Sequence, residues 1–265
     1  MNIAFCVCVV LTVVCVSTVC GEEGEWCIVC TTRVSELSGT GDDDKSEVQC
    51  KSGEVMTGCS SYSPGKGHGK RDGEFFKTDT NGNAVCVAQN GYKGTGVYAY
   101  ARCCHWPKMT CQYVKGEQSE TSDDAISIAQ CPDVIDCMSA SVTGCAVHTY
   151  WQNLDGTQPN VPSYPTELTD ITDNYCYGVN GYSGKGVTGH AACCGAPGLK
   201  CKAKFSEQVK NAEAKVKCDD GWILTGCSVR TSWKETDGAY IDDDDNCIAA
   251  GTDKLWAVAV CCKTG

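Results

Sequence analysis

Residues 257–262 read Ala257-Val258-Ala259-Val260-Cys261-Cys262, and two similar segments occur earlier in the chain. These are Tyr98–Cys104 and Thr188–Cys194, and each is a run of apolar or small residues that ends in two adjacent cysteines. Successive side chains on a β-strand point to opposite faces of the sheet. Two adjacent cysteines on such a strand therefore need different partners. The recurrence predicts three disulfide-linked β modules.

The modules share further features in the same order. We place module one at residues 27–104, module two at 111–194 and module three at 201–262. Each has a short run of alternating polar and apolar residues before its second repeat cysteine, which predicts a half-buried strand, and then a Thr-Gly-Cys triplet. Short strands separated by turn residues are typical of β-sandwiches and jelly rolls. A glycine within a strand predicts a bulge or a close backbone approach. The triplets are Thr57-Gly58-Cys59, Thr143-Gly144-Cys145 and Thr225-Gly226-Cys227.

Residues 1–20 have the pattern of a secretory signal peptide. An apolar stretch without charged side chains is followed by small residues and then by Glu22 and Glu23, which favours a cleaved signal over a membrane anchor. No later stretch is apolar enough to span a bilayer. The net charge is −11, which argues against nucleic acid as a partner, because phosphate would be repelled. Cationic partners or calcium fit this charge.

The cysteines predict disulfides, because the chain is expected in an oxidising compartment and an even number of cysteines follows the signal peptide. Six cysteines per module allow fifteen pairings, and a nested scheme is the simplest that sends adjacent cysteines to different partners. Cys27 and Cys137 are left over, and we predict a bridge between them that joins modules one and two. The nested pairs are Cys30–Cys104, Cys50–Cys103, Cys59–Cys86, Cys111–Cys194, Cys131–Cys193, Cys145–Cys176, Cys201–Cys262, Cys218–Cys261 and Cys227–Cys247.

Several strings resemble the Cys-rich C-terminal domain of proprotein convertase subtilisin/kexin type nine. They are the Thr-Gly-Cys-Ser segments, Gly96–Cys104, Ala196–Lys202 and Gly221–Ser228, and the resemblance spans Cys30 to Cys262. It implies a pseudo-threefold bundle of three β-sandwich modules, each similar to a resistin subunit, with the same nested disulfides. No subtilisin-like Asp, His or Ser motif precedes the modules, so the receptor regulation known in that family is not expected here.

Three sets of residues are candidates for binding. Carboxylates in a loop can ligate calcium, and the best candidate is the run Asp242, Asp243, Asp244 and Asp245, which Cys247 anchors; a solvated acidic loop is the alternative. Residues 66–72 form a basic loop, for which the alternatives are a processing site at Lys70-Arg71, a contact for an anionic partner, or an exposed turn-rich loop. Trp151 and Tyr150 lie in a long polar loop, where an exposed aromatic side chain can anchor a partner.

No catalytic motif is found, and calcium is the one cofactor for which the sequence offers a candidate site. We therefore expect a secreted, non-enzymatic protein that recognises an extracellular protein partner through its loops. The alternative is a structural component of an extracellular matrix, adhesive or mineralised layer with calcium-binding acidic loops. We expect a monomer, because three modules in one chain complete the pseudo-threefold arrangement.

Overall fold

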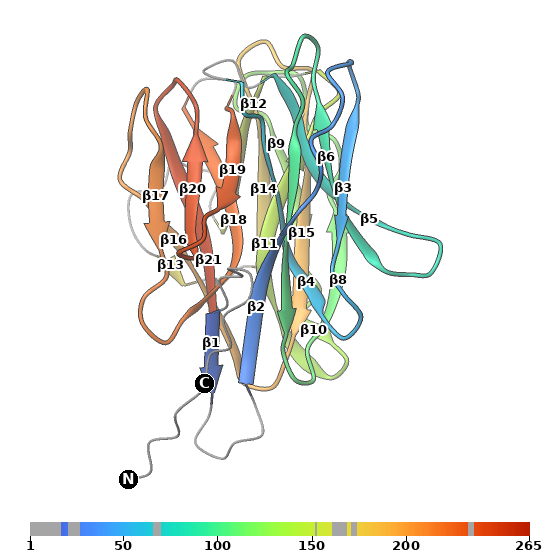
Figure 1. The fold of residues 1–265 in the computed structure, drawn as a ribbon, viewed down its shortest axis with the longest axis vertical. Helices are drawn as coiled ribbons and strands as arrows, with labels where there is room; N and C mark the ends of the chain where they lie inside the picture. Colours follow the sequence, from blue (N-terminus) through green and yellow to red (C-terminus); the bar gives the residue numbers. More distant parts are fainter. Residues whose placement is uncertain are drawn as a thin grey trace.

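The computed structural model describes residues 17–20, 27–65, 70–151, 153–160, 169–170, 174–232 and 236–265, with the backbone alone for 17–20, 27 and 169–170. All regular structure in these residues is β-strand, and the strands run along the long axis of the molecule (Figure 1). The all-β architecture of tandem disulfide-rich modules is confirmed. The described residues contain no helix that could cross a membrane.

The strands form three sheets of similar size. In sheet order, the first is β1 (Ser17–Cys20), β2 (Cys27–Val34), β7 (Tyr98–His105), β4 (Val55–Tyr62), β19 (Gly238–Ile241), β20 (Asn246–Ala250) and β17 (Ala214–Lys217). The second is β3 (Lys45–Gln49), β6 (Ala84–Asn90), β5 (Arg71–Thr78), β11 (Met138–His148), β15 (Thr188–Gly195) and β8 (Thr110–Lys115), with β10 (Val134–Ile135) paired to β11. The third is β13 (Thr169–Asp170), β16 (Leu199–Phe205), β21 (Leu255–Thr264), β18 (Ile223–Thr231), β12 (Leu154–Pro159), β14 (Tyr175–Asn180) and β9 (Ile126–Gln130).

Each sheet combines strands from two modules. Module one supplies three strands to the first sheet and three to the second. Module two supplies strands to the second and third sheets, and module three supplies strands to the third and first sheets. The modules therefore follow one another cyclically around a pseudo-threefold axis. The alternating runs that the sequence predicts as half-buried strands are the edge-side strands β3, β9 and β17, in which buried and exposed residues alternate.

The three junctions between modules have the same local structure. An Asp-Gly pair in one module brings its glycine opposite a large residue of the next: Gly73 opposite His148, Gly156 opposite Arg230 and Gly238 opposite Tyr62. All three glycines have positive φ values, of 96°, 99° and 112°. A Cβ atom on any of them would overlap a carbonyl oxygen of the neighbouring module, so only glycine lets the two backbones approach.

We expect Gly156→Ala to lower the free energy of unfolding by about 1–3 kcal/mol, because the new Cβ meets the Val229 carbonyl and the φ of 99° is strained for alanine. Chemical denaturation of the whole chain measures this difference. Gly82→Ala is the matched control, since Gly82 also has a positive φ but nothing within 4 Å of its Cβ position. Equal losses in the two variants would show that the junction contact contributes nothing.

The Thr-Gly-Cys triplets lie at the pseudo-threefold axis. Each triplet contains the predicted bulge, since the strand register shifts at Thr57, Thr143 and Thr225. The following glycines contact one another in a cycle: a Cβ on Gly58 would lie 2.6 Å from the Thr225 oxygen, one on Gly144 would lie 2.5 Å from the Thr57 oxygen, and one on Gly226 would lie 2.6 Å from the Thr143 oxygen. The close backbone approach predicted at these glycines is therefore between modules.

Two of the three nested disulfides in each module connect its two sheets, and all nine nested pairs predicted from the sequence are present. The outermost pair of each module joins residues directly opposite on adjacent strands, as in Cys30 and Cys104. These three outermost bridges meet in one apolar cluster that also holds Trp106, which is 5% exposed and lies in the linker at residues 105–110 between modules one and two. The linker is therefore part of the core between the modules.

The predicted Cys27–Cys137 bridge is wrong, because Cys137 is a free, exposed cysteine. The segment around Cys137, which has no counterpart in the other two modules, folds as its own hairpin of β10 with β11, and Asp136 and Cys137 form its two-residue turn with φ values of 48° and 64°. Positive φ at both turn residues is the geometry of a tight hairpin. The thiol thus lies at the tip of the hairpin, whereas the backbone of Cys27 pairs with that of Cys20 in β1.

Two other predicted segments are only partly described. The predicted signal peptide lies outside the described residues except for its last four, which form β1. Of the basic loop at residues 66–72, positions 66–69 also lie outside them. Arg71 is 2% exposed, and its guanidinium lies 2.6 Å from Glu74 and donates a hydrogen bond of 2.8 Å to Thr236 of module three. The side chain of Arg71 is thus a contact between modules.

Candidate binding surface

Two loops at one end of the molecule repeat the same sequence pattern. Residues 90–96 and 180–186 both read Asn-Gly-Tyr-x-Gly-x-Gly and connect β6 to β7 and β14 to β15. In each, the buried asparagine side chain accepts a hydrogen bond of 3.0 Å from the last glycine's backbone N–H. Its amide nitrogen donates to a backbone carbonyl in the loop that precedes β3 or β9, that of Gly41 or of Ser122. Both loops are therefore held in a fixed conformation.

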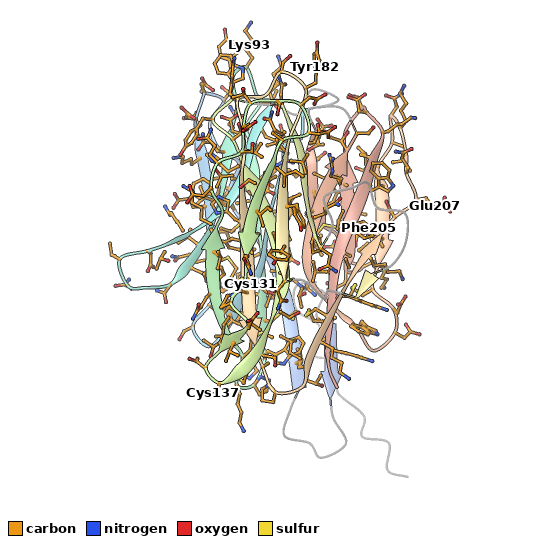
Figure 2. All side chains as sticks on the ribbon, turned by 180° about the vertical axis from the view of Figure 1, so that it is seen from behind. Lys93, Cys131, Cys137, Tyr182, Phe205 and Glu207 are labelled. Atoms are coloured by element: carbon orange, nitrogen blue, oxygen red, sulfur yellow. A yellow bond between two sulfur atoms is a disulfide. The ribbon has the colours of Figure 1, made fainter. Side chains whose placement is uncertain are left out.

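These loops expose their tyrosines. Tyr92 is 54% exposed and Tyr182 is 50% exposed. Figure 2 shows Lys93 and Tyr182 at the same end of the molecule, with Cys137 at the opposite end. Fixed loops that expose large aromatic rings resemble binding surfaces more than ordinary turns, because tyrosine gives a large contact area with little loss of side-chain entropy.

The loop that carries Tyr150 and Trp151 lies between the two tyrosine loops. On one side, the Thr149 backbone N–H donates to the backbone carbonyl of Asp72, and the backbone N–H of Gly91 donates to the carbonyl of Lys70. On the other side, the Thr149 hydroxyl donates to the Gly186 carbonyl over 2.8 Å, and Gly181 donates to the Asn153 carbonyl. The hydrogen bonds thus connect the Tyr150 loop to the Tyr182 loop directly and to the Tyr92 loop through residues 70–72.

The predicted exposure of Tyr150 and Trp151 is confirmed, since their exposed fractions are 69% and 56%. The Tyr150 ring also contacts the ring of His148 edge-on, with centroids 4.8 Å apart. One end of the protein therefore carries four exposed aromatic side chains; we call Tyr92, Tyr150, Trp151 and Tyr182 the aromatic end. The sequence shows the Gly-rich turns but does not indicate that their tyrosines share a surface with Trp151.

Two buried histidines pack with Phe75 next to Tyr150 of the aromatic end. His148 and His190 are 6% and 5% exposed, and Phe75 lies against both rings. Burial, together with Lys45 and Lys115, lowers the pKa of His148 to about 4. Burial, His148 and Lys115 lower the pKa of His190 to about 3. Both imidazoles are neutral at physiological pH and pack as ring systems.

Exposed acidic pairs flank the two tyrosine loops. The Asp43 backbone N–H donates to the Asn90 carbonyl and that of Asp124 to the Asn180 carbonyl, each over 3.0 Å. Asp42 precedes the first and Asp123 the second, and all four residues are exposed. Each tyrosine loop therefore has a pair of aspartates at its base.

The acidic run predicted as a calcium site lies elsewhere, in the turn between β19 and β20. Asp242 accepts hydrogen bonds from the backbone of Asp244 and Asn246 and binds Lys215. Asp245 lies 2.8 Å from the buried Arg102 of module one. In the described residues these carboxylates form no convergent group of three or more. Calcium binding at Asp242–Asp245 stays a prediction.

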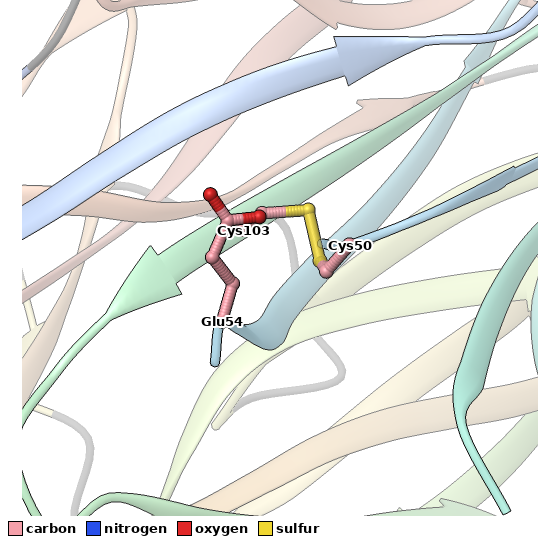
Figure 3. A group of neighbouring side chains, drawn as sticks. All are labelled: Cys50, Glu54 and Cys103. Carbon is pink, nitrogen blue, oxygen red and sulfur yellow. A yellow bond between two sulfur atoms is a disulfide. The ribbon is translucent and has the colours of Figure 1, made fainter. Parts of the chain in front are cut away.

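Among the side chains that the structure describes, two groups do converge closely enough for a metal ion. One is Cys50, Glu54 and Cys103, but the two cysteines form a disulfide (Figure 3) and Glu54 lies 2.8 Å from Arg33. The other is Asp42, Asp43 and Asp72, where the Gln89 amide donates to both Asp43 and Asp72. The disulfide removes the thiolates that the first group would need.

The comparison with protein families agrees with this architecture. Two family models described as "Proprotein convertase subtilisin-like/kexin type 9 C-terminal domain" match the chain, one over residues 22–108 and one over residues 195–265. The chain belongs to this family. The two matched regions contain modules one and three, and the disulfide nesting and strand order repeat in module two between them. As a member of the family, the protein is a Cys-rich C-terminal-type domain built from tandem β modules.

Proposed function

We propose that this protein is a secreted, non-enzymatic interaction module that recognises an extracellular protein partner through its aromatic end. The observation that carries the proposal is the exposure of four large aromatic side chains on three hydrogen-bonded loops at one end of the molecule. Exposed tyrosine and tryptophan residues on a rigid support are typical of the side chains that dominate binding energy at interfaces.

The scaffold suits this role. The nine disulfides among the described residues and the three shared sheets fix the positions of the loops, so little conformational entropy is lost when a partner binds. Disulfides of this number are typical of secreted proteins, which supports an extracellular location. Because the junctions between modules are all formed within one chain, we expect a monomer, and a stable trimer in sedimentation would contradict this expectation.

Binding of the labelled full chain to intact cells of the source tissue tests the proposal. We expect saturable binding that Tyr150→Ala/Trp151→Ala weakens at least about tenfold, because such anchors contribute more than 1 kcal/mol each. Val134→Ala is the control, since Val134 is 57% exposed on the hairpin that carries Cys137. Equal binding by the double variant and the unmodified chain would refute the aromatic end as the recognition surface.

The second candidate is a structural matrix component with calcium-binding acidic loops. It is favoured by the close approach of the Asp42, Asp43 and Asp72 carboxylates, and oxygen ligands of this kind suit calcium. Calorimetric titration of the full chain with calcium distinguishes the two candidates. Binding that is lost in Asp42→Asn and accompanied by self-association would support the structural role, whereas no heat of binding would leave recognition as the function.

A further inference from the structure

Modules one and two each carry the same pair of features side by side. An exposed tyrosine, Tyr92 or Tyr182, stands on the fixed Asn-Gly-Tyr loop, and an exposed aspartate pair lies at the base of that loop. The backbone hydrogen bonds from Asp43 to Asn90 and from Asp124 to Asn180 hold each aspartate pair against its tyrosine loop. The combination of aromatic ring and carboxylates therefore occurs twice at one end of the protein.

Module three has neither the tyrosine loop nor the aspartate pair. The positions of the aspartate pair are taken by Lys210 and Asn211, and Asn211 keeps the left-handed backbone, with φ of 53°, that Asp43 and Asp124 also have. In place of the tyrosine loop, a short connection from Gly251 to Lys254 joins β20 to β21. The backbone of the repeat thus does not require either feature. Their joint presence in two modules and joint absence in the third indicate one shared role.

The chemistry of this pair suits a cation. An aromatic face attracts ammonium and guanidinium groups, and adjacent carboxylates add charge and hydrogen bonds. The Lys93 ammonium lies 5.1 Å from the centre of the Tyr92 ring, so this ring already makes one cation–π contact within its own loop, and the side chain stays 54% exposed. The net charge of −11 attracts a basic partner and repels an acidic one.

We infer that the aromatic end binds a cationic polypeptide, with arginine or lysine side chains stacked on Tyr92 and Tyr182 and paired with the adjacent aspartates. This inference rests on the proposed function and names the chemistry of its partner. Tyr150 and Trp151, between the two tyrosine loops, contact the apolar parts of the same segment. Two equivalent contacts on one rigid scaffold make the binding bivalent, because the second contact forms at high effective concentration.

Calorimetric titration of the full chain with an oligo-arginine peptide tests the inference, with oligo-glutamate as the second probe. We expect oligo-arginine to bind and oligo-glutamate not to bind. Tyr92→Ala/Tyr182→Ala should weaken binding about tenfold without changing the net charge, as expected for loss of two cation–π contacts. Asp42→Asn/Asp123→Asn should weaken it by a similar factor and reduce its salt dependence.

A charge-matched control separates a specific site from general attraction. Asp133→Asn/Asp220→Asn removes the same charge from two exposed positions away from the tyrosine loops, and we expect binding within about twofold of the unmodified chain. Unchanged circular dichroism and melting temperature confirm that each variant is folded. Full binding by the tyrosine variant, or equal losses in the aspartate variant and the control, would overturn the inference. The cell-binding result with Tyr150→Ala/Trp151→Ala would then decide the proposed function separately.

Discussion

Arg71→Met should lower the free energy of unfolding by about 3–5 kcal/mol, because it leaves a buried carboxylate without its partner. The side chains of Arg71 and Glu74 are 1% and 4% exposed and lie 2.6 Å apart. Burial raises the pKa of Glu74, and Arg71 opposes that rise. The substitution also removes the donors to the Thr236 carbonyl and hydroxyl across the junction between modules one and three. Chemical denaturation of the full chain measures the loss.

Two variants make this prediction specific. Arg33→Met breaks an ion pair with Glu54 that is about one-fifth exposed on both sides, so its cost should be about 1 kcal/mol or less. Arg71→Met/Glu74→Gln removes the unpaired charge as well and should recover part of the stability. If Arg71→Met cost no more than Arg33→Met, the buried network at this junction would have no structural role.

Acidification should destabilise the protein through His148 and His190. Their folded-state pKa values lie below the ordinary histidine value, so below about pH 6.5 the unfolded chain takes up protons that the folded chain excludes. Stability is therefore full above pH 6.5 and falls as the pH decreases. A shift to about 4 at His148 corresponds to about 3 kcal/mol lost by pH 4. Denaturation at pH 7 and pH 4 measures it.

The histidine effect is isolated by comparison with a variant that lacks both imidazoles. Other groups titrate in the opposite sense: burial raises the pKa of Asp155 to about 8, with Arg230 opposing this and Asp124 adding to it. His148→Gln/His190→Gln keeps those groups, so the difference in pH dependence between the two proteins reports the histidines alone. Parallel stability curves from pH 7 to pH 4 would contradict the assignment of buried, neutral imidazoles.

The architecture was largely readable from the sequence because its strongest signals are local. The Cys-Cys pair on a strand needs two partners on opposite faces, and the simplest scheme that meets this requirement is the nested one that the structure contains. The Thr-Gly-Cys triplet likewise shows a bulge by its glycine. The triplet does not indicate which backbone packs against its glycine. The backbone that approaches Gly58 belongs to Thr225, in another module.

The shared sheets could not be predicted, since a strand has the same alternation whichever module supplies the strand beside it. The buried arginines Arg71, Arg102 and Arg230 follow from those junctions, and each looks like an ordinary charged residue in the sequence. For Cys137, the sequence predicted a contact that the structure does not contain. The count of cysteines suggested a bridge, but the tight turn at Asp136 and Cys137 directs the thiol to solvent.

The aromatic end also depends on long-range contacts. Trp151 was identifiable as an exposed residue from its polar loop, but its position between Tyr92 and Tyr182 arises from hydrogen bonds that link Thr149 to Asp72 and Gly186. The junction between modules one and two thus places the loops of both modules on one surface. The scaffold determines which loops meet, and under the proposed function these loops carry the recognition chemistry.

Photo-crosslinking on the tissue that secretes or receives the protein tests the central claim most directly. A photoreactive phenylalanine analogue is placed at Tyr92, Trp151 or Tyr182 in the full chain, and in separate chains at Val134 or Asp220, which are exposed elsewhere. We predict one crosslinked protein species shared by the three positions at the aromatic end and absent from the other two. Crosslinks from Val134 or Asp220 alone, with none from the aromatic end, would contradict the account.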